Sequence, residues 1–138
     1  MKYINLLNGK AGDLVQLITE ETLKAISKLN LPARFRNKLQ QDIDYLLNKC
    51  YSDVLEIRVF GSCATGQYRA SSDIDLLVIT KELIRDRFLR GEIQEALDEP
   101  LDGVTTDVVF YTMDSYLKSQ DIFSSELRKY SFLLWKRS

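Results

Sequence analysis

The chain has 138 residues, of which 45% are hydrophobic, so a single domain with a substantial core is expected. Nineteen basic residues against 20 acidic residues give a net charge of −1, which leaves no overall positive field to hold a long nucleic acid. The sequence contains no histidine, which excludes Ser-His-Asp and Cys-His catalysis and any zinc site with histidine ligands.

The first part of the chain, residues 1–52, predicts a helical hairpin. Asp13 fits a helix cap, and the apolar stripe after it consists of Leu14, Ile18, Thr22, Ala25, Ile26 and Leu29. Pro32 interrupts this helix and can open a second one. The stripe of the second helix consists of Phe35, Leu39, Ile43, Leu46 and Leu47. We expect this hairpin to pack on the rest of the chain or to extend it.

The second part, residues 53–138, predicts strands and helices in one α/β (α+β) unit. The expected strands cover residues 54–60, 71–79 and 104–111, and the first has Leu55, Ile57 and Val59 on one face. Between the first two strands, residues 64–68 predict a helical turn. A helix is expected over 81–97, with inward residues Ile84, Phe88, Ile93, Ala96 and Leu97. A closing amphipathic helix is marked by Phe123, Leu127, Tyr130 and Leu134.

A glycine-serine pair and two aspartates carry the chemical signal of this sequence. Gly61 and Ser62 follow the first strand, and Asp73 and Asp75 lie in the second. Residues two apart on a strand point to the same face, so the two carboxylates would repel each other by roughly 4 kcal/mol at about 4 Å. We therefore expect a divalent cation between them. Gly61 would let a phosphate approach the backbone, and Ser62 would donate its hydroxyl and amide to it.

A third acid, Asp107, stands at the head of a strand that is otherwise apolar. We expect this strand to pair with the one that carries Asp73 and Asp75, and Asp107 to position or deprotonate an incoming hydroxyl. Without histidine, oxygen-ligated Mg²⁺ or Mn²⁺ is the metal that the composition allows. Each motif alone would be an ordinary turn or a solvated strand, but together they indicate phosphoryl or nucleotidyl transfer.

The segment GSCATGQYRASSDIDL resembles the signature of the polymerase-beta-like nucleotidyltransferase superfamily. Its ten-residue gap between Gly61-Ser62 and Asp73-Ile74-Asp75 is similar to that of the minimal nucleotidyltransferase (MNT) branch. The resemblance implies nucleotide binding by Gly61 and Ser62, and both catalysis and metal binding by Asp73, Asp75 and Asp107. It also implies a small mixed β-sheet of the nucleotidyltransferase type, flanked by helices.

The resemblance implies an enzyme that moves AMP, or another nucleoside monophosphate, from a nucleoside triphosphate to a hydroxyl. ATP is the expected donor, two Mg²⁺ ions are the expected cofactors, and Mn²⁺ is the alternative metal. Proteins of the MNT branch resemble antitoxins that silence a small helical HEPN-type toxin, an RNase, by adding AMP to a tyrosine. We expect such a partner here, and a homodimer remains an alternative for the oligomeric state.

One position departs from the pattern of the superfamily. Many members carry arginine and then glycine shortly after the glycine-serine pair, whereas this chain has Thr65 before Gly66. A positive contact to the triphosphate would then come from Arg69, from Lys81 or from a partner. Cys63 follows Ser62, but without a histidine or a basic neighbour we expect it to be structural.

Two other functions stay open. A small-molecule nucleotidyltransferase of the aminoglycoside-modifying type would need an acidic acceptor pocket, to which Asp98, Glu99 and Asp102 could contribute. A non-catalytic module of the same fold would instead cover its partner, and exposed apolar residues such as Leu31 or Phe35 would favour that function.

The cysteine content and the apolar runs bear on location. Cys50 and Cys63 are too few for a disulfide scaffold, and we recognise no secretion signal before them. The apolar runs are far shorter than the ~20 residues of a membrane helix. We therefore expect a soluble, reduced, cytoplasmic protein.

Overall fold

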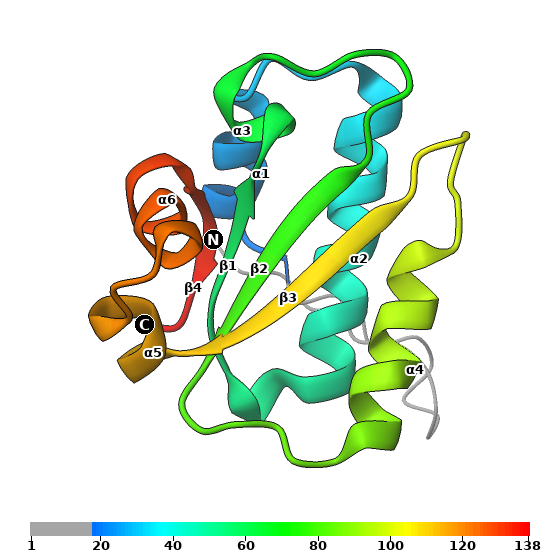
Figure 1. Ribbon diagram of the computed structural model, residues 1–138. Coiled ribbons are helices and arrows are strands. Elements are labelled where there is room, and N and C mark those ends of the chain that lie inside the picture. Colours follow the sequence, from blue (N-terminus) through cyan, green and yellow to red (C-terminus); the bar gives the residue numbers. More distant parts are fainter. Residues whose placement is uncertain (1–17) are drawn as a thin grey trace, which may run out of the picture.

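The computed structural model describes residues 18–138 (Figure 1). The first helix, α1 (Glu20–Ser27), begins after Thr19, whose hydroxyl accepts a hydrogen bond from the backbone N–H of Thr22. The predicted cap at Asp13 and the first stripe residue, Leu14, lie outside the described residues. Ile18 is buried but precedes the helix, so the expectation that it lies within the helical stripe is wrong.

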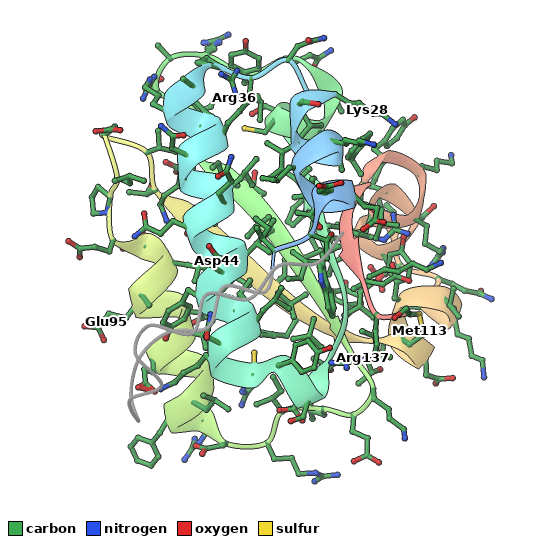
Figure 2. The ribbon with its side chains drawn as sticks, turned by 180° about the vertical axis from the view of Figure 1, so that it is seen from behind. Lys28, Arg36, Asp44, Glu95, Met113 and Arg137 are labelled. Atoms are coloured by element: carbon green, nitrogen blue, oxygen red, sulfur yellow. The ribbon has the colours of Figure 1, made fainter. Side chains whose placement is uncertain are left out.

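The second helix of the hairpin is confirmed. Helix α2 (Ala33–Cys50) begins directly after Pro32, whose carbonyl accepts hydrogen bonds from the N–H groups of Phe35 and Arg36. All five residues of its predicted stripe are buried. Figure 2 views the molecule from the side of α2, which crosses the back of the sheet.

The sheet has four strands in the order β3-β2-β1-β4. Strands β2 and β3 are parallel, whereas β1 is antiparallel to both β2 and β4. This mixed sheet flanked by helices confirms the predicted fold class. The strands are β1 (Val54–Phe60), β2 (Ile74–Thr80), β3 (Thr106–Thr112) and β4 (Phe132–Lys136).

The two faces of the sheet differ in their cover. On one face Ile74, Leu76 and Val78 of β2 join the main core, which also contains the stripes of α1 and α2 and the inner residues of α4 (Arg87–Asp98). On the other face Leu77 and Ile79 pack against a smaller cluster from α5 (Met113–Lys118) and α6 (Ile122–Tyr130). In Figure 1, α5 and α6 gather apart from α2 and α4.

Strand β1 has the predicted ends but not quite the predicted alternation. A bulge in its pairing with β2 lies between Val54 and Glu56. The buried residues are consequently Val54, Ile57 and Val59, whereas Leu55 is only half-buried. The bulge shifts one end of the strand by a residue, which reverses the side to which that end points.

Two of the predicted helices have different boundaries. The turn after β1 is helix α3 (Ser62–Thr65), which begins two residues earlier than expected. Helix α4 begins at Arg87 rather than at residue 81, because the carboxylate of Asp86 accepts hydrogen bonds from the N–H groups of Phe88 and Leu89. Phe88 lies in this first turn and is 90% exposed, so its predicted inward position is wrong.

The end of the chain holds one helix, α5, and one strand, β4, that the sequence did not predict. A predicted closing helix would include Leu134, but α6 ends at Tyr130 and Leu134 is a buried residue of β4. Ser131 separates the two elements because its backbone is extended. Phe123 and Tyr130 are 47% and 54% exposed, so neither is the core residue that the helical spacing predicted.

The helical hairpin and the sheet share one hydrophobic core. Leu31 and Phe35, which would favour a covering module if they were exposed, are both buried in it. A short 3-10 helix (Tyr51–Asp53) joins α2 directly to β1. Within residues 18–138, no helix is long and apolar enough to cross a membrane.

Candidate active site

Gly61 lies at the turn between β1 and α3. Its backbone has φ 71° and ψ −154°, which side chains other than glycine rarely adopt. A Cβ atom at this position would lie 2.5 Å from Oδ2 of Asp75. The carbonyl of Gly61 accepts hydrogen bonds from the N–H groups of Ala64 and Thr65, which close the turn. Glycine is therefore required both by the backbone angle and by the close approach of a carboxylate.

Asp75 and Asp107 lie side by side on the two parallel strands. The two strands pair as predicted, and their register makes Asp75 and Asp107 direct partners. Asp75 also faces Phe60 of β1. Because alternate residues share a face, Asp75 lies on the same side of the sheet as Leu77 and Ile79, the side that α5 and α6 cover. Asp107 is exposed and Asp75 is half-buried. Both carboxylates thus belong to the less covered face of the sheet.

The charges of the neighbouring aspartates act on Asp75. Burial raises the pKa of its carboxyl to about 6, and the negative charges of Asp107 and then Asp73 add to the increase. The repulsion expected from the sequence is therefore present in the structure, with Asp107 as a larger contributor than Asp73.

Asp73 was expected within the second strand, but it lies directly before β2, which begins at Ile74. Its carboxylate atom Oδ1 accepts a hydrogen bond of 2.6 Å from the hydroxyl of Thr105, and its backbone carbonyl accepts one of 3.7 Å from the thiol of Cys63. Sequence reasoning missed Thr105. Its place two residues before Asp107 in TTDVVF, on a strand expected beside the aspartate pair, is the signal that could have identified it.

The three carboxylates are not a closed metal cage as they stand. Within residues 18–138, no three histidine, cysteine, aspartate or glutamate side chains converge on one metal position. The donor set nevertheless suits a hard cation, because Asp75, Asp107 and the second oxygen of Asp73 are carboxylate oxygens on adjoining segments. Their mutual effect on the pKa of Asp75 is the kind of repulsion that a bound cation relieves.

A buried ion pair lies on the opposite face of β3. Nζ of Lys38 donates to the carboxylate of Asp42 at 2.6 Å and to the carbonyl of Leu97 at 2.7 Å. The other oxygen of Asp42 accepts a hydrogen bond of 2.6 Å from the hydroxyl of Thr106, the residue before Asp107. This network joins α2, α4 and β3 directly behind the candidate site. The helical spacing of Lys38 and Asp42 allowed their pairing, but nothing in the sequence placed Thr106 beside them.

The loop between β1 and β2 contains Cys63 and Arg69, and Lys81 was a further candidate for a contact to the triphosphate. Burial and the nearby charge of Asp75 raise the pKa of the Cys63 thiol to about 11, so this cysteine is a poor nucleophile, as expected. Arg69 is exposed in the loop, whereas Lys81 follows the far end of β2 and lies away from Gly61. Arg34 of α2, which the sequence did not single out, donates to the carbonyl of Ala70 and holds the loop against the helix.

Solved structures share this architecture. A protein assigned as a nucleotidyltransferase from Sulfolobus solfataricus superposes with a TM-score of 0.53 and 17% identity, covering 93% of this chain and 94% of its own. A toxin-antitoxin structure with AMP-PNP gives a TM-score of 0.51 and 23% identity, and the match covers 71% of this chain and 73% of the other. A variant of the toxin-antitoxin MntA-HpeT gives a TM-score of 0.51 and 22% identity, and the match again covers 71% of this chain and 73% of the other. At these identities the likeness establishes the fold.

Sequence comparison establishes the family. No curated protein matches the chain significantly. The sequence profile of the family described as "Nucleotidyltransferase domain" matches residues 33–130, which include all three aspartates and the whole of α2 and α6. This span exceeds half of the chain, and the expected class of enzyme is confirmed with it. The chain therefore belongs to the nucleotidyltransferase domain family and is a transferase of that class.

Proposed function

We propose that this protein transfers AMP from ATP to a hydroxyl of a partner protein, in the role of an antitoxin. The observation that carries the proposal is the register pairing of Asp75 with Asp107 beside Gly61, in a chain of the nucleotidyltransferase family. The fold likeness to two toxin-antitoxin structures, one of them with AMP-PNP, supports the donor and the kind of partner.

In this proposal the residues have separate roles. The backbone at Gly61 and the hydroxyl of Ser62 bind the triphosphate. Asp73, Asp75 and Asp107 would hold two Mg²⁺ ions, which supply charge neutralisation for the departing pyrophosphate. Asp107 accepts the proton of the incoming hydroxyl, whose oxygen forms a bond to the α-phosphorus as the bond to the bridging oxygen of pyrophosphate breaks.

The acceptor is proposed to be a tyrosine of a HEPN-type toxin encoded next to this chain. The test is incubation of the purified protein with Mg²⁺ and each labelled nucleoside triphosphate, with and without the product of the neighbouring gene. We expect label from ATP on that neighbour and loss of labelling in Asp73→Asn. A variant that still transfers would contradict the metal-binding role of Asp73. Retained neutralisation of the neighbour without transfer would favour a non-catalytic covering module.

A second candidate acceptor is a cationic small molecule such as an aminoglycoside. An open hollow of about 570 Å³ lies between α4 and β3, and Glu95, Asp98 and Asp107 are among its lining residues. A carboxylate-lined hollow next to the proposed base suits a polyamine. Of the three acids expected to form such a pocket, Asp98 lies there, whereas Glu99 and Asp102 are not among the lining residues.

The two acceptors separate in one assay. Asp98→Asn should leave transfer to a protein partner unchanged, because the hollow is not needed for it. If labelled AMP instead appears on an aminoglycoside, and Asp98→Asn raises the KM for that acceptor, the small-molecule function is the correct one.

A further inference from the structure

Two aromatic side chains lie next to the proposed phosphate and metal residues and have no part in the roles described so far. Phe60 is the last residue of β1, directly before Gly61, and it faces Asp75 across the antiparallel pair. Phe123 comes from α6, more than 60 residues later in the chain, and its ring centroid is 5.8 Å from that of Phe60. The planes meet at 79°, an edge-to-face arrangement.

The position of this pair follows from the alternation of side chains between the two faces of the sheet. Phe60 packs against the cluster that contains Leu77 and Ile79, so its side chain lies on the face of the sheet that also carries Asp75. Directly opposed residues on one face of an antiparallel pair have Cβ atoms about 5 Å apart. The side chains of Phe60 and Asp75 therefore leave the same face of the sheet side by side, and the ring of Phe123 packs against that of Phe60.

Phe123 is not needed to fill the core. It remains 47% exposed, and its neighbour Ile122 is 81% exposed. The buried residues of α6 are Ser124 and Leu127, which already fix the helix to the sheet. Ser124 does so through a hydrogen bond between its hydroxyl and that of Tyr111 on β3. An open aromatic ring is thus held rigidly on a helix whose attachment does not depend on it.

We propose that Phe123, supported edge-on by Phe60, is the platform on which the base of the donor nucleotide stacks. This inference rests on the proposed function, because it takes the triphosphate to lie at Gly61 and the aspartates. The ribose separates base and triphosphate, so a base site has to lie beside the phosphate site but not within it. The aromatic pair has that position. Stacking on an aromatic side chain is favourable for every base, since each has a π face.

An apolar side chain of a partner protein is the competing occupant of this surface. The location favours the nucleotide, since Phe60 and Gly61 are consecutive residues and a triphosphate bound at Gly61 brings its base to this vicinity. Leu117, an exposed apolar residue of the neighbouring helix α5, provides a matched control.

The test measures binding of ATP and of inorganic tripolyphosphate, each with Mg²⁺, by calorimetry. Loss of a stacked base typically costs about 1–3 kcal/mol, so Phe123→Ala should weaken ATP binding about 5- to 150-fold. Tripolyphosphate has no base, and its affinity should stay within about twofold. Phe123→Trp should bind ATP at least as well as the natural protein, and Leu117→Ala should change neither affinity.

Phe123→Leu guards against a folding artefact, because it keeps the apolar contact with Phe60 but removes the ring. Weakened ATP binding with unchanged tripolyphosphate binding in this variant supports the platform. Unchanged ATP binding in a folded Phe123→Ala or Phe123→Leu protein overturns it, as does an equal loss for both ligands. If Phe123→Ala weakens only binding of the partner protein, the surface is a protein-docking site. These results leave the proposed function standing, whereas natural protein that binds neither ligand contradicts both proposals.

Discussion

Gly61 shows how a single residue sets the geometry of the site. Glycine is needed at this position for two independent reasons. The first is its positive φ, and the second is the oxygen of Asp75 that lies where a Cβ would be. The first ends β1 and turns the chain into α3. The second lets the backbone pass close to Asp75, so that a ligand on the turn also lies beside the carboxylates.

Gly61→Ala should therefore lower both stability and activity. We expect a loss of about 1–3 kcal/mol in the free energy of unfolding from backbone strain, together with loss of nucleotidyl transfer as Asp75 is displaced. Urea denaturation and a transfer assay measure the two effects. Gly91→Ala is the control, since Gly91 lies within α4 with open space where a Cβ would lie, and the variant should gain about 0.5–1 kcal/mol in stability. Equal behaviour of the two variants would contradict the close-approach argument.

The carboxyl of Asp75 makes the metal-free protein sensitive to pH. Its folded-state pKa of about 6 lies above the ordinary value of 3.8, so the folded state binds this proton more tightly than the unfolded state does. The charged form therefore destabilises the fold above about pH 6, and this penalty disappears as the pH falls toward 4. The charged, half-buried carboxylate of Asp75 therefore lowers the stability of the metal-free protein, and a bound cation would restore it.

Asp75→Asn should consequently be more stable than the natural protein at about pH 7.5 without metal. The difference should be on the order of 1 kcal/mol, because each pKa unit corresponds to about 1.4 kcal/mol and solvent screens a half-buried group. The gain should shrink when both proteins are unfolded in urea at about pH 4.5. A gain independent of pH would show that charge on Asp75 is not its cause.

At the scale of single residues, the strand pattern correctly predicted that β3 pairs with β2, but not the register that places Asp75 opposite Asp107. It did not place Asp73, which lies just before the strand and is tied to Thr105. Local periodicity cannot reveal such a contact, because Thr105 and Asp73 are 32 positions apart and meet only when β2 and β3 pair in parallel.

At the scale of elements, the closing helix illustrates a false periodicity. Leu127, Tyr130 and Leu134 have helical spacing, but Phe132 to Trp135 is also a short apolar run of the kind that forms a buried strand. Pairing with β1 decides the outcome, because β4 completes the sheet on its otherwise open side. The sequence alone could not distinguish the two structures, since the deciding contacts come from a strand about 75 residues earlier.

The buried ion pair of Lys38 and Asp42 connects two helices to the strand that carries Asp107. Lys38→Met should lower the free energy of unfolding by about 3–5 kcal/mol, because the substitution leaves the carboxylate of Asp42 buried without its cation. Chemical denaturation measures this loss. Lys49→Met is the matched control on the same helix, since Lys49 pairs with Glu92 at the surface and its removal should change stability far less. Comparable losses in the two variants would argue against the structural importance of the buried pair.

At the scale of the whole molecule, the hairpin and the sheet cannot be separated by their contacts. The stripes of α1 and α2 fill the face of the sheet opposite the candidate site, and the matched family region begins at α2. Among the described residues, four of the eight exposed large apolar side chains lie on α5 and α6. The fold thus divides its sheet into a closed face for stability and a more open face on which we place the chemistry.

We place nucleotidyl transfer at the aspartates of this open face. The most direct measurement compares ATP labelled at the α-phosphorus with ATP labelled at the γ-phosphorus, using Mg²⁺ and the product of the neighbouring gene. Nucleotidyl transfer at these aspartates predicts that only the α-label reaches the acceptor, that pyrophosphate is released with it, and that Asp107→Asn abolishes both. Transfer of the γ-label, or undiminished transfer by Asp107→Asn, would contradict it.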